Sequence, residues 1–275
     1  MVPGARTTAP FDPGTLTPRR DQPPRQPGSL RRDATAAGAR VGDHPLMRVL
    51  TPAGLTDSTL AAAVEELAAR DPALGGIVAR YGPPPMWARE PGFPTLVHLV
   101  LEQQVSLASA KAAFNRLRAV VDPLTPAGFL ALDDAQLLAI GFSRQKARYG
   151  RALAAAVLDG GLDLDALPGL DDDEVDAALV AVPGIGPWTA TIYRLMVLLR
   201  PDAWPIHDIA LAQAIAEVRG LDRRPAAGEL LALAEGWRPW RAVAARILWH
   251  HYLSARAERR ERRLARGQPQ PPTAA

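Results

Sequence analysis

From Leu55 onward, apolar residues recur every three or four positions in one segment after another, and no segment alternates apolar and polar residues as a half-buried strand does. Ser, Thr or Asp precedes several of these segments and Gly or Pro follows them, as is usual at the two ends of a helix. The sequence therefore predicts an all-α fold. The expected helices cover residues 56–71, 93–121 with a break near 104–106, 133–141, 143–160, 171–182, 187–200, 207–220, 228–236 and 238–266.

The two ends of the chain differ from its middle. Residues 1–46 are rich in Pro, Gly, Thr and Arg without an apolar period, so we expect a disordered tail there. Residues 47–255 form the predicted helical domain, and residues 256–275 its basic helical extension and a tail. No run approaches the roughly 20 apolar residues that a membrane span needs. We therefore expect a soluble protein.

The charge of the chain is unevenly distributed. The formal net charge is +3 at pH 7, but the positive excess lies in the two terminal regions, and the residues between them carry a net negative charge. A basic region attracts polyanions. Because the body of the chain is mildly acidic, any site for a polyanion there has to be built locally.

Residue types exclude several chemistries. The chain has no Cys, which removes disulfides, thiolate metal sites, iron–sulfur clusters and cysteine nucleophiles. His98, His207, His250 and His251 show no metal-binding spacing such as H-E-x-x-H, and no Ser stands in a nucleophile elbow. We therefore expect no metal site of this kind, and we expect His207 to face solvent.

The stretch Pro183-Gly184-Ile185-Gly186-Pro187 lies between two expected helices. Gly permits the positive φ or the close backbone approach that a tight turn needs, and Pro187 suits the first helical position. Such a turn exposes backbone N–H groups at a helix N-terminus, which attract phosphate through oriented donors and the helix dipole. The alternative is an ordinary corner between two helices.

Asp208 stands at the start of the apolar segment that follows, where an aspartate normally caps a helix. Capping does not exclude chemistry, because a carboxylate held by backbone donors is favoured in its ionised form. An ionised carboxylate stabilises the oxocarbenium-like sugar that forms when a glycosidic bond breaks. Both roles stay open on the residues alone.

These residues have the order of a known family. The arrangement "VPGIGPWTA…WPIHD" resembles the helix-hairpin-helix DNA glycosylase superfamily, and within it the 3-methyladenine DNA glycosylase II branch. Three further stretches agree with that branch, "LVLEQQVSLASAKAA", "IGFSRQKARYGRALA" and "GWRPWRAVAARILWHHY". The resemblance covers roughly residues 50–253. It implies two helical subdomains that flank a cleft.

The resemblance assigns the reacting and phosphate-binding positions. Asp208 matches the catalytic aspartate. Gly184, Ile185, Gly186 and Thr189 match the hairpin that holds a DNA phosphate, often with a monovalent cation on its carbonyls. No other cofactor is implied.

Further positions follow from the same resemblance. Trp249 matches an aromatic residue of the base pocket, and Trp204 is a candidate to add to it. We expect Trp188 to offer the extruded base a further aromatic face. Gln104 lies near the residue that fills the gap left by the extruded base. Lys146 is a candidate phosphate contact or, equally, a solvated surface charge.

The implied function is that of a monofunctional DNA glycosylase, which hydrolyses the N-glycosidic bond of alkylated purines of the 3-methyladenine type in damaged double-stranded DNA. Trp188 stands where bifunctional relatives carry a lysine, so lyase chemistry is not expected. The preferred base stays open, because Ile192 stands where a close relative has a pocket tyrosine. We expect a monomer in the cytoplasm, associated with the nucleoid.

Two other functions remain open from the sequence. A non-catalytic helix-hairpin-helix module would bind DNA with the same glycines and would not need Asp208. A helical interaction scaffold would need neither the hairpin nor the carboxylate. We expect the final Arg/Glu run to continue its helix into solvent rather than to form a dedicated DNA-binding tail, with non-specific attraction to DNA as its simplest role.

Overall fold

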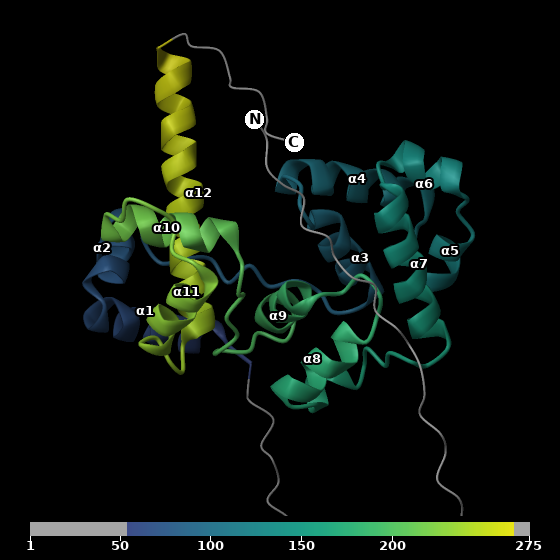
Figure 1. Cartoon of the computed structure of the whole chain (residues 1–275), viewed down its shortest axis with the longest axis horizontal. Coiled ribbons are helices and arrows are strands. Elements are labelled where there is room, and N and C mark those ends of the chain that lie inside the picture. The colour runs from purple at the N-terminus through teal and green to yellow at the C-terminus, as the bar shows by residue number, and fades with distance from the viewer. Residues whose placement is uncertain (1–53, 267–275) are drawn as a thin grey trace, which may run out of the picture. The chain divides into compact units, whose positions relative to one another are not determined.

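The structure is a computed structural model, and it describes residues 54–266, so the predicted tail over 1–46 lies outside the described residues. Within residues 54–266 the chain forms helices and no strand, which confirms the all-α prediction (Figure 1). The helices are α1 (Asp57–Arg70), α2 (Pro72–Tyr81), α3 (Phe93–Glu102), α4 (Leu107–Val120), α5 (Pro126–Leu130), α6 (Asp134–Ile140), α7 (Arg144–Leu158), α8 (Asp172–Val180), α9 (Pro187–Met196), α10 (Ile209–Arg219), α11 (Ala227–Glu235) and α12 (Arg241–Ala265), with a 3-10 turn η1 (Leu167–Gly169) before α8.

The helix ends follow the predicted capping residues. Thr56 and Asp171 each form a capping box with the residue three positions later, at the starts of α1 and α8. Ser106 caps α4, so the predicted break between α3 and α4 is confirmed. Gly141 and Gly220 end α6 and α10 in the left-handed conformation.

The largest differences from the prediction are two additional helices and the end of α9. Helices α2 and α5 were not expected, since each is short, begins at a proline and contains glycine. In α2, the position of a Cβ on Gly75 would lie 2.6 Å from the Ala68 carbonyl oxygen, so glycine lets α2 approach α1. Helix α9 ends at Met196 rather than at residue 200, because Leu199 has φ 54 and turns the chain away.

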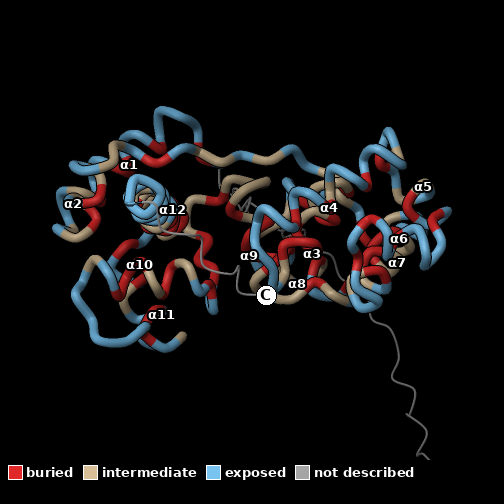
Figure 2. The backbone as a smooth tube through the Cα atoms, turned by 90° about the horizontal axis from the view of Figure 1, so that it is seen from above, coloured by how far each residue is buried: buried red, intermediate tan, exposed pale blue. Residues whose placement is uncertain are grey.

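The described helices pack in two groups. In the first group, α1 packs on α2 and α12, and α12 also packs on α2 and α10. In the second group, α3 packs on α4, α7 and α9. Helix α5 covers α7, α6 covers α4, and α8 covers α9. The buried residues line the inner sides of both groups (Figure 2). Among residues 54–266, no helix is long and apolar enough to cross a membrane.

Two connecting segments run between the groups: residues 82–92 and residues 197–208. Buried charged side chains fix the ends of these segments through hydrogen bonds and an ion pair. The fully buried Arg246 of α12 donates to the carbonyl oxygens of Met86 at 2.8 Å and Leu195 at 2.7 Å. Burial lowers the pKa of Arg246 to about 10, so its guanidinium stays charged at neutral pH. Arg89 of the first segment forms a bidentate pair with the buried Glu102, at 3.0 and 2.9 Å.

Candidate active site

The hairpin between α8 and α9 depends on one glycine for its shape. Gly184 has φ 95, and a Cβ built on it would lie 2.1 Å from Cγ of Tyr149. Both the conformation and the contact therefore require glycine. Gly186 differs, because its φ of −96 suits any residue and nothing lies within 4 Å of its Cβ position. The backbone at Gly186 is thus open to the approach of another molecule.

The first turn of α9 offers free backbone donors. Within the described part of the chain, no side chain caps this helix. The N–H groups of Trp188 and Thr189 precede the first possible partner inside the helix. Because Pro187 has no N–H, these two donors and the positive end of the helix dipole form an anion site.

Gln103 holds the hairpin in place. Its Nε2 donates to the carbonyl oxygen of Gly184 at 2.9 Å and to Oγ1 of Thr189 at 3.0 Å. The Thr189 side chain is 2% exposed, so its hydroxyl serves the hairpin and not an external ligand. Sequence analysis singled out the neighbouring Gln104 and missed Gln103. Nothing in the two adjacent glutamines distinguishes them until the end of α3 at Glu102 is known.

Asp208 is held by three N–H donors from three parts of the fold. Its Oδ1 accepts from the backbone N–H of Leu211 at 2.9 Å and from Nε1 of Trp249 at 3.2 Å. Its Oδ2 accepts from Nε1 of Trp188 at 3.1 Å. The residue is 9% exposed and caps α10, so the capping role and a fixed, partly shielded carboxylate occur together.

The three predicted pocket tryptophans take different positions. Trp188 and Trp249 meet at Asp208 and direct their indole N–H groups to it. Trp204 is 5% exposed and packs on Trp237, with ring centroids 5.4 Å apart. Among the described residues, the indole N–H of Trp204 has no hydrogen-bond partner, and it does not bind Asp208.

Two residues beside the site adopt the left-handed conformation, which is uncommon for residues other than glycine. His207 has φ 68, is exposed, and turns the chain directly before Asp208. Gln104 has φ 57 and stands exposed in the turn between α3 and α4, next to the exposed Val105. Such conformations persist where the surrounding structure fixes them, and they often occur at functional sites.

The structure gives Lys146 an internal partner. Its Nζ donates to the carbonyl oxygen of Leu101 at 2.7 Å, in the last turn of α3 and two residues before Gln103. Burial lowers the pKa of the Lys146 ammonium. Its contact with a DNA phosphate stays a prediction.

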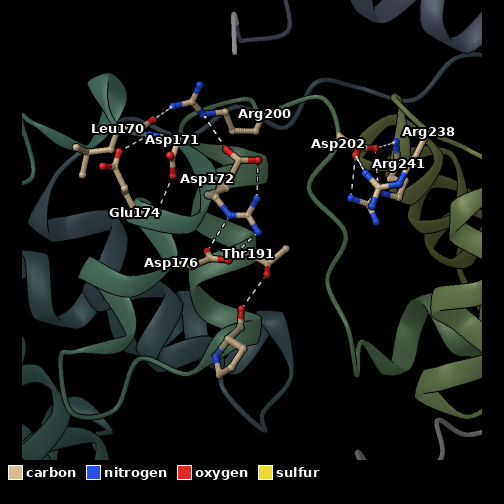
Figure 3. Close-up of polar contacts among 12 residues, drawn as sticks. Leu170, Asp171, Asp172, Glu174, Asp176, Thr191, Arg200, Asp202, Arg238 and Arg241 are labelled. Atoms are coloured by element: carbon tan, nitrogen blue, oxygen red, sulfur yellow. Dashed lines mark hydrogen bonds and ion pairs between the residues drawn. The ribbon is translucent and has the colours of Figure 1, made fainter. Parts of the chain in front are cut away.

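The segment that carries Asp208 is fastened at its start, as Figure 3 shows. The buried Arg200 donates to the carbonyl oxygen of Leu170 at 2.8 Å. Asp202 accepts from Nε and Nη2 of Arg241, at 2.9 and 2.8 Å, and it also pairs with Arg238. The "WRPWR" motif that starts at Trp237 therefore anchors this segment to the beginning of α12, a role that the motif alone did not indicate.

Comparisons with known proteins give one family. A family model described as HhH-GPD superfamily base excision DNA repair protein matches residues 97–239, more than half of the chain. A DNA-3-methyladenine glycosylase of Bacillus subtilis is 30% identical over 118 residues, 43% of this chain and 39% of that protein. The solved structure of the Schizosaccharomyces pombe 3-methyladenine DNA glycosylase in complex with abasic DNA has a TM-score of 0.63 and 26% identity, over 68% of this chain and 95% of that chain.

A second solved structure, a DNA-3-methyladenine glycosidase of Bacillus halodurans, has a TM-score of 0.60 and 27% identity, over 74% of this chain and 93% of that chain. The chain spans less than half the length of several curated relatives, namely 43% and 39% of two Bacillus subtilis proteins and 32% of a Mycobacterium tuberculosis protein. Residues 97–239, which the family model matches, include the hairpin and Asp208.

Proposed function

This chain belongs to the HhH-GPD superfamily of base excision DNA repair proteins, and from that membership we propose that it is a monofunctional DNA glycosylase acting on alkylated purines. The observation that carries the proposal is the carboxylate of Asp208, fixed by two indole N–H groups and one backbone N–H. The names of the relatives, which are 3-methyladenine glycosylases, support the same substrate class.

The reaction needs one carboxylate and one water. Alkylation gives the purine a positive charge, which weakens the bond between the base and C1′ of the sugar, so no strong general acid is required. As that bond breaks, Asp208 stabilises the developing sugar cation and orients the attacking water. The water oxygen bonds to C1′ and its proton is released, which leaves a free base and an abasic site. Trp188 lies in the position of the lysine of bifunctional relatives, so no Schiff base forms.

Access to the base requires extrusion from the duplex. Flipping costs a few kcal/mol and less for a damaged pair. The exposed turn with Gln104 and Val105 is suited to fill the gap in the duplex. The half-buried Trp188 offers a cationic base a stacking contact, worth roughly 0.5 to 2 kcal/mol as a cation–π interaction. Trp249 is 8% exposed in the free protein, so its ring would contact the base only at its exposed edge.

The hairpin supplies contacts to the DNA backbone. The N–H groups of Trp188 and Thr189 bind a phosphate without reading sequence. A monovalent cation on the hairpin carbonyls would add to this attraction. The carbonyl oxygen of Gly184 accepts a hydrogen bond from Gln103, and that of Val182 accepts one from the Ile185 N–H. Each carbonyl oxygen keeps a second lone pair, so these residues fit a monovalent cation. No step of the reaction depends on it.

The likeness to a solved complex with abasic DNA supports duplex DNA as the partner. The chain would act as a monomer in the cytoplasm, on nucleoid DNA. A non-catalytic hairpin module is the weaker alternative, because such a module needs no carboxylate held between two indoles.

The test is base release from duplex oligonucleotides that each carry one alkylated or deaminated base, with DNA binding measured in parallel. We expect Asp208→Asn to lower release at saturating DNA by about 100- to 1,000-fold while binding persists. Asp133→Asn is the matched control, because Asp133 also caps a helix through its side chain but lies at α6. Release of no lesion by the wild type, with duplex binding intact, would favour the non-catalytic module.

A further inference from the structure

The last helix extends beyond the helices that cover its first half. Residues 242–249 of α12 are buried against the first helix group. After Ala255 every residue is half-buried or exposed, and the helix continues to Ala265 without a break. Figure 1 shows this second half projecting beyond α2 and α10. The basic run is therefore part of the same rigid helix that supplies Trp249 to the site.

Four of the six arginines of this extension lie on one side of the helix. Starting at Trp249, the spacings of three and four residues lead through Tyr252 to four arginines, which at 100° per residue fall within an arc of about 80°. We name these four the arginine face: Arg256, Arg259, Arg263 and Arg266. The face begins seven residues after Trp249 and spans about 15 Å along the helix from its first to its last arginine.

The acidic residues of the extension lie on other sides of the helix. Glu258 and Glu261 lie away from the arginine face by the same helical geometry. Glu258 pairs with Arg80 of α2 at 2.7 Å and with Arg262 at 2.9 Å. Glu217 of α10 pairs with the face through Arg259 at 3.5 Å. A charged helix that serves solubility alone does not require its positive and negative side chains to lie on different sides.

The base of the arginine face adjoins the start of α10. An open hollow of about 510 Å³ lies between α10 and α12, and its lining includes Ile209, Tyr252, Arg256 and Arg259. Ile209 directly follows Asp208 and is 67% exposed. The Arg256 guanidinium lies over the Tyr252 ring, 4.4 Å from its centroid, which holds it at the rim of the hollow.

We propose that the arginine face is a second DNA-binding surface, which contacts backbone phosphates of the duplex beyond the nucleotide at Asp208. The inference rests on the proposed function, in that the ligand is duplex DNA. Arginine forms bidentate hydrogen bonds with phosphate. A straight face of about 15 Å covers about four base-pair steps at 3.4 Å each. The acidic body of the chain then gains its attraction for DNA from a helix that is rigidly joined to the site.

Duplex DNA suits the face better than an anionic membrane surface does. A helix that lies in a membrane interface needs a broad apolar side opposite its basic side. On the side opposite the arginine face, the extension has Leu264, small alanines and its two glutamates. It therefore lacks the apolar side that would enter a bilayer.

The test measures affinity for an undamaged duplex as a function of salt, with the full chain and two double variants. The first is Arg256→Gln with Arg263→Gln, on the arginine face. The second is Arg70→Gln with Arg118→Gln, exposed arginines of α1 and α4 that change the net charge equally and do not contact the extension in any described pair. Loss of two phosphate contacts lowers the slope of log affinity against log salt by about 2. We expect this loss in the first variant and an unchanged slope in the second.

Three results would overturn the inference: equal slopes in both variants and the wild type, equal loss in both variants, or tighter binding of the wild type to vesicles of anionic lipid than to DNA through the same arginines. Base release at saturating damaged DNA separates this inference from the proposed function. The first variant should need more damaged DNA to reach half-maximal release, so that its KM rises by a larger factor than its kcat falls. If the wild type releases no base and the slope still depends on the arginine face, the proposed function fails and the second surface stands.

Discussion

Nε1 of Trp188 lies 3.1 Å from Oδ2 of Asp208, and this hydrogen bond joins the first turn of α9 to the first turn of α10. The helix that presents donors to a phosphate thereby also fixes the carboxylate. In the proposed complex, this contact and the indole bond from Trp249 would place DNA at the hairpin relative to Asp208.

Replacement of each tryptophan by phenylalanine separates its N–H group from its ring. Trp188→Phe and Trp249→Phe each remove a donor to Asp208 and keep an aromatic face, so we expect kcat/KM to fall by about 10- to 100-fold through a misplaced carboxylate. Trp204→Phe is the matched control, because its N–H has no partner among the described residues. Single-turnover base release measures all three. An equal loss of kcat/KM in Trp204→Phe would contradict this distinction and would support a role for Trp204 in the base pocket.

The two adjacent glutamines should differ in effect. Gln103→Ala removes both bonds to the hairpin, and we expect it to lower the free energy of unfolding by about 1 to 3 kcal/mol and to weaken DNA binding. Gln104→Gly relaxes a positive φ, so the free protein should be as stable as the wild type or more stable by about 1 kcal/mol. Its base release should still fall, because the side chain that fills the duplex gap is gone. Urea unfolding and base release, measured on both variants, would contradict this assignment if the two positions behaved alike.

Much of the fold could be predicted because it is encoded locally. The 3.6-residue period and the capping residues predict the longer helices, and Ser106 marks the break after α3. Helix α2 was missed because Gly75 and Gly76 lower its local propensity. Its stability comes from contact with α1 and α12, which no window of sequence contains.

The candidate site could be predicted only in part. Asp208 and Gly184 belong to a motif with fixed spacing, so the sequence alone singles them out as candidates. The sequence does not show where Trp188 and Trp204 direct their indoles, and only tertiary packing turns one to Asp208 and the other to Trp237 in the core. Gln103 is identified only by where α3 ends.

Stability should depend on pH through His98. Burial lowers the pKa of this imidazole from its usual 6.5, Glu102 acts in the opposite direction, and Arg89 and Lys111 lower it further. The ring stacks on Phe114 with centroids 4.3 Å apart. The pKa of His98 is lower in the folded than in the unfolded protein, so folding favours the neutral imidazole. The contribution of neutral His98 to the free energy of unfolding is therefore present above pH 6.5 and is lost as the pH falls through the folded pKa.

The check is the urea midpoint at neutral and mildly acidic pH. His98→Phe keeps the stacking contact and removes the titrating group, so its midpoint should change less with pH than that of the wild type. His207→Asn is the control, because His207 is exposed and Asn tolerates its positive φ. A wild-type pH dependence that His98→Phe retains in full would assign the effect to other groups.

The two hairpin glycines provide the sharpest separation of folding from binding. Gly184→Ala places a Cβ against Tyr149 at a positive φ, so we expect the free energy of unfolding to fall by at least about 2 kcal/mol. Gly186→Ala meets no atom within 4 Å and has an ordinary φ, so stability should hold or rise by about 0.4 to 1 kcal/mol. A phosphate that packs on the α9 N-terminus would meet the new methyl group, and we expect DNA affinity to fall by roughly tenfold, or 1.4 kcal/mol. Thermal unfolding and duplex binding on both variants measure these effects. If Gly186→Ala binds duplex DNA like the wild type, the phosphate does not approach the hairpin at Gly186, and the anion site has to be sought elsewhere on the first turn of α9.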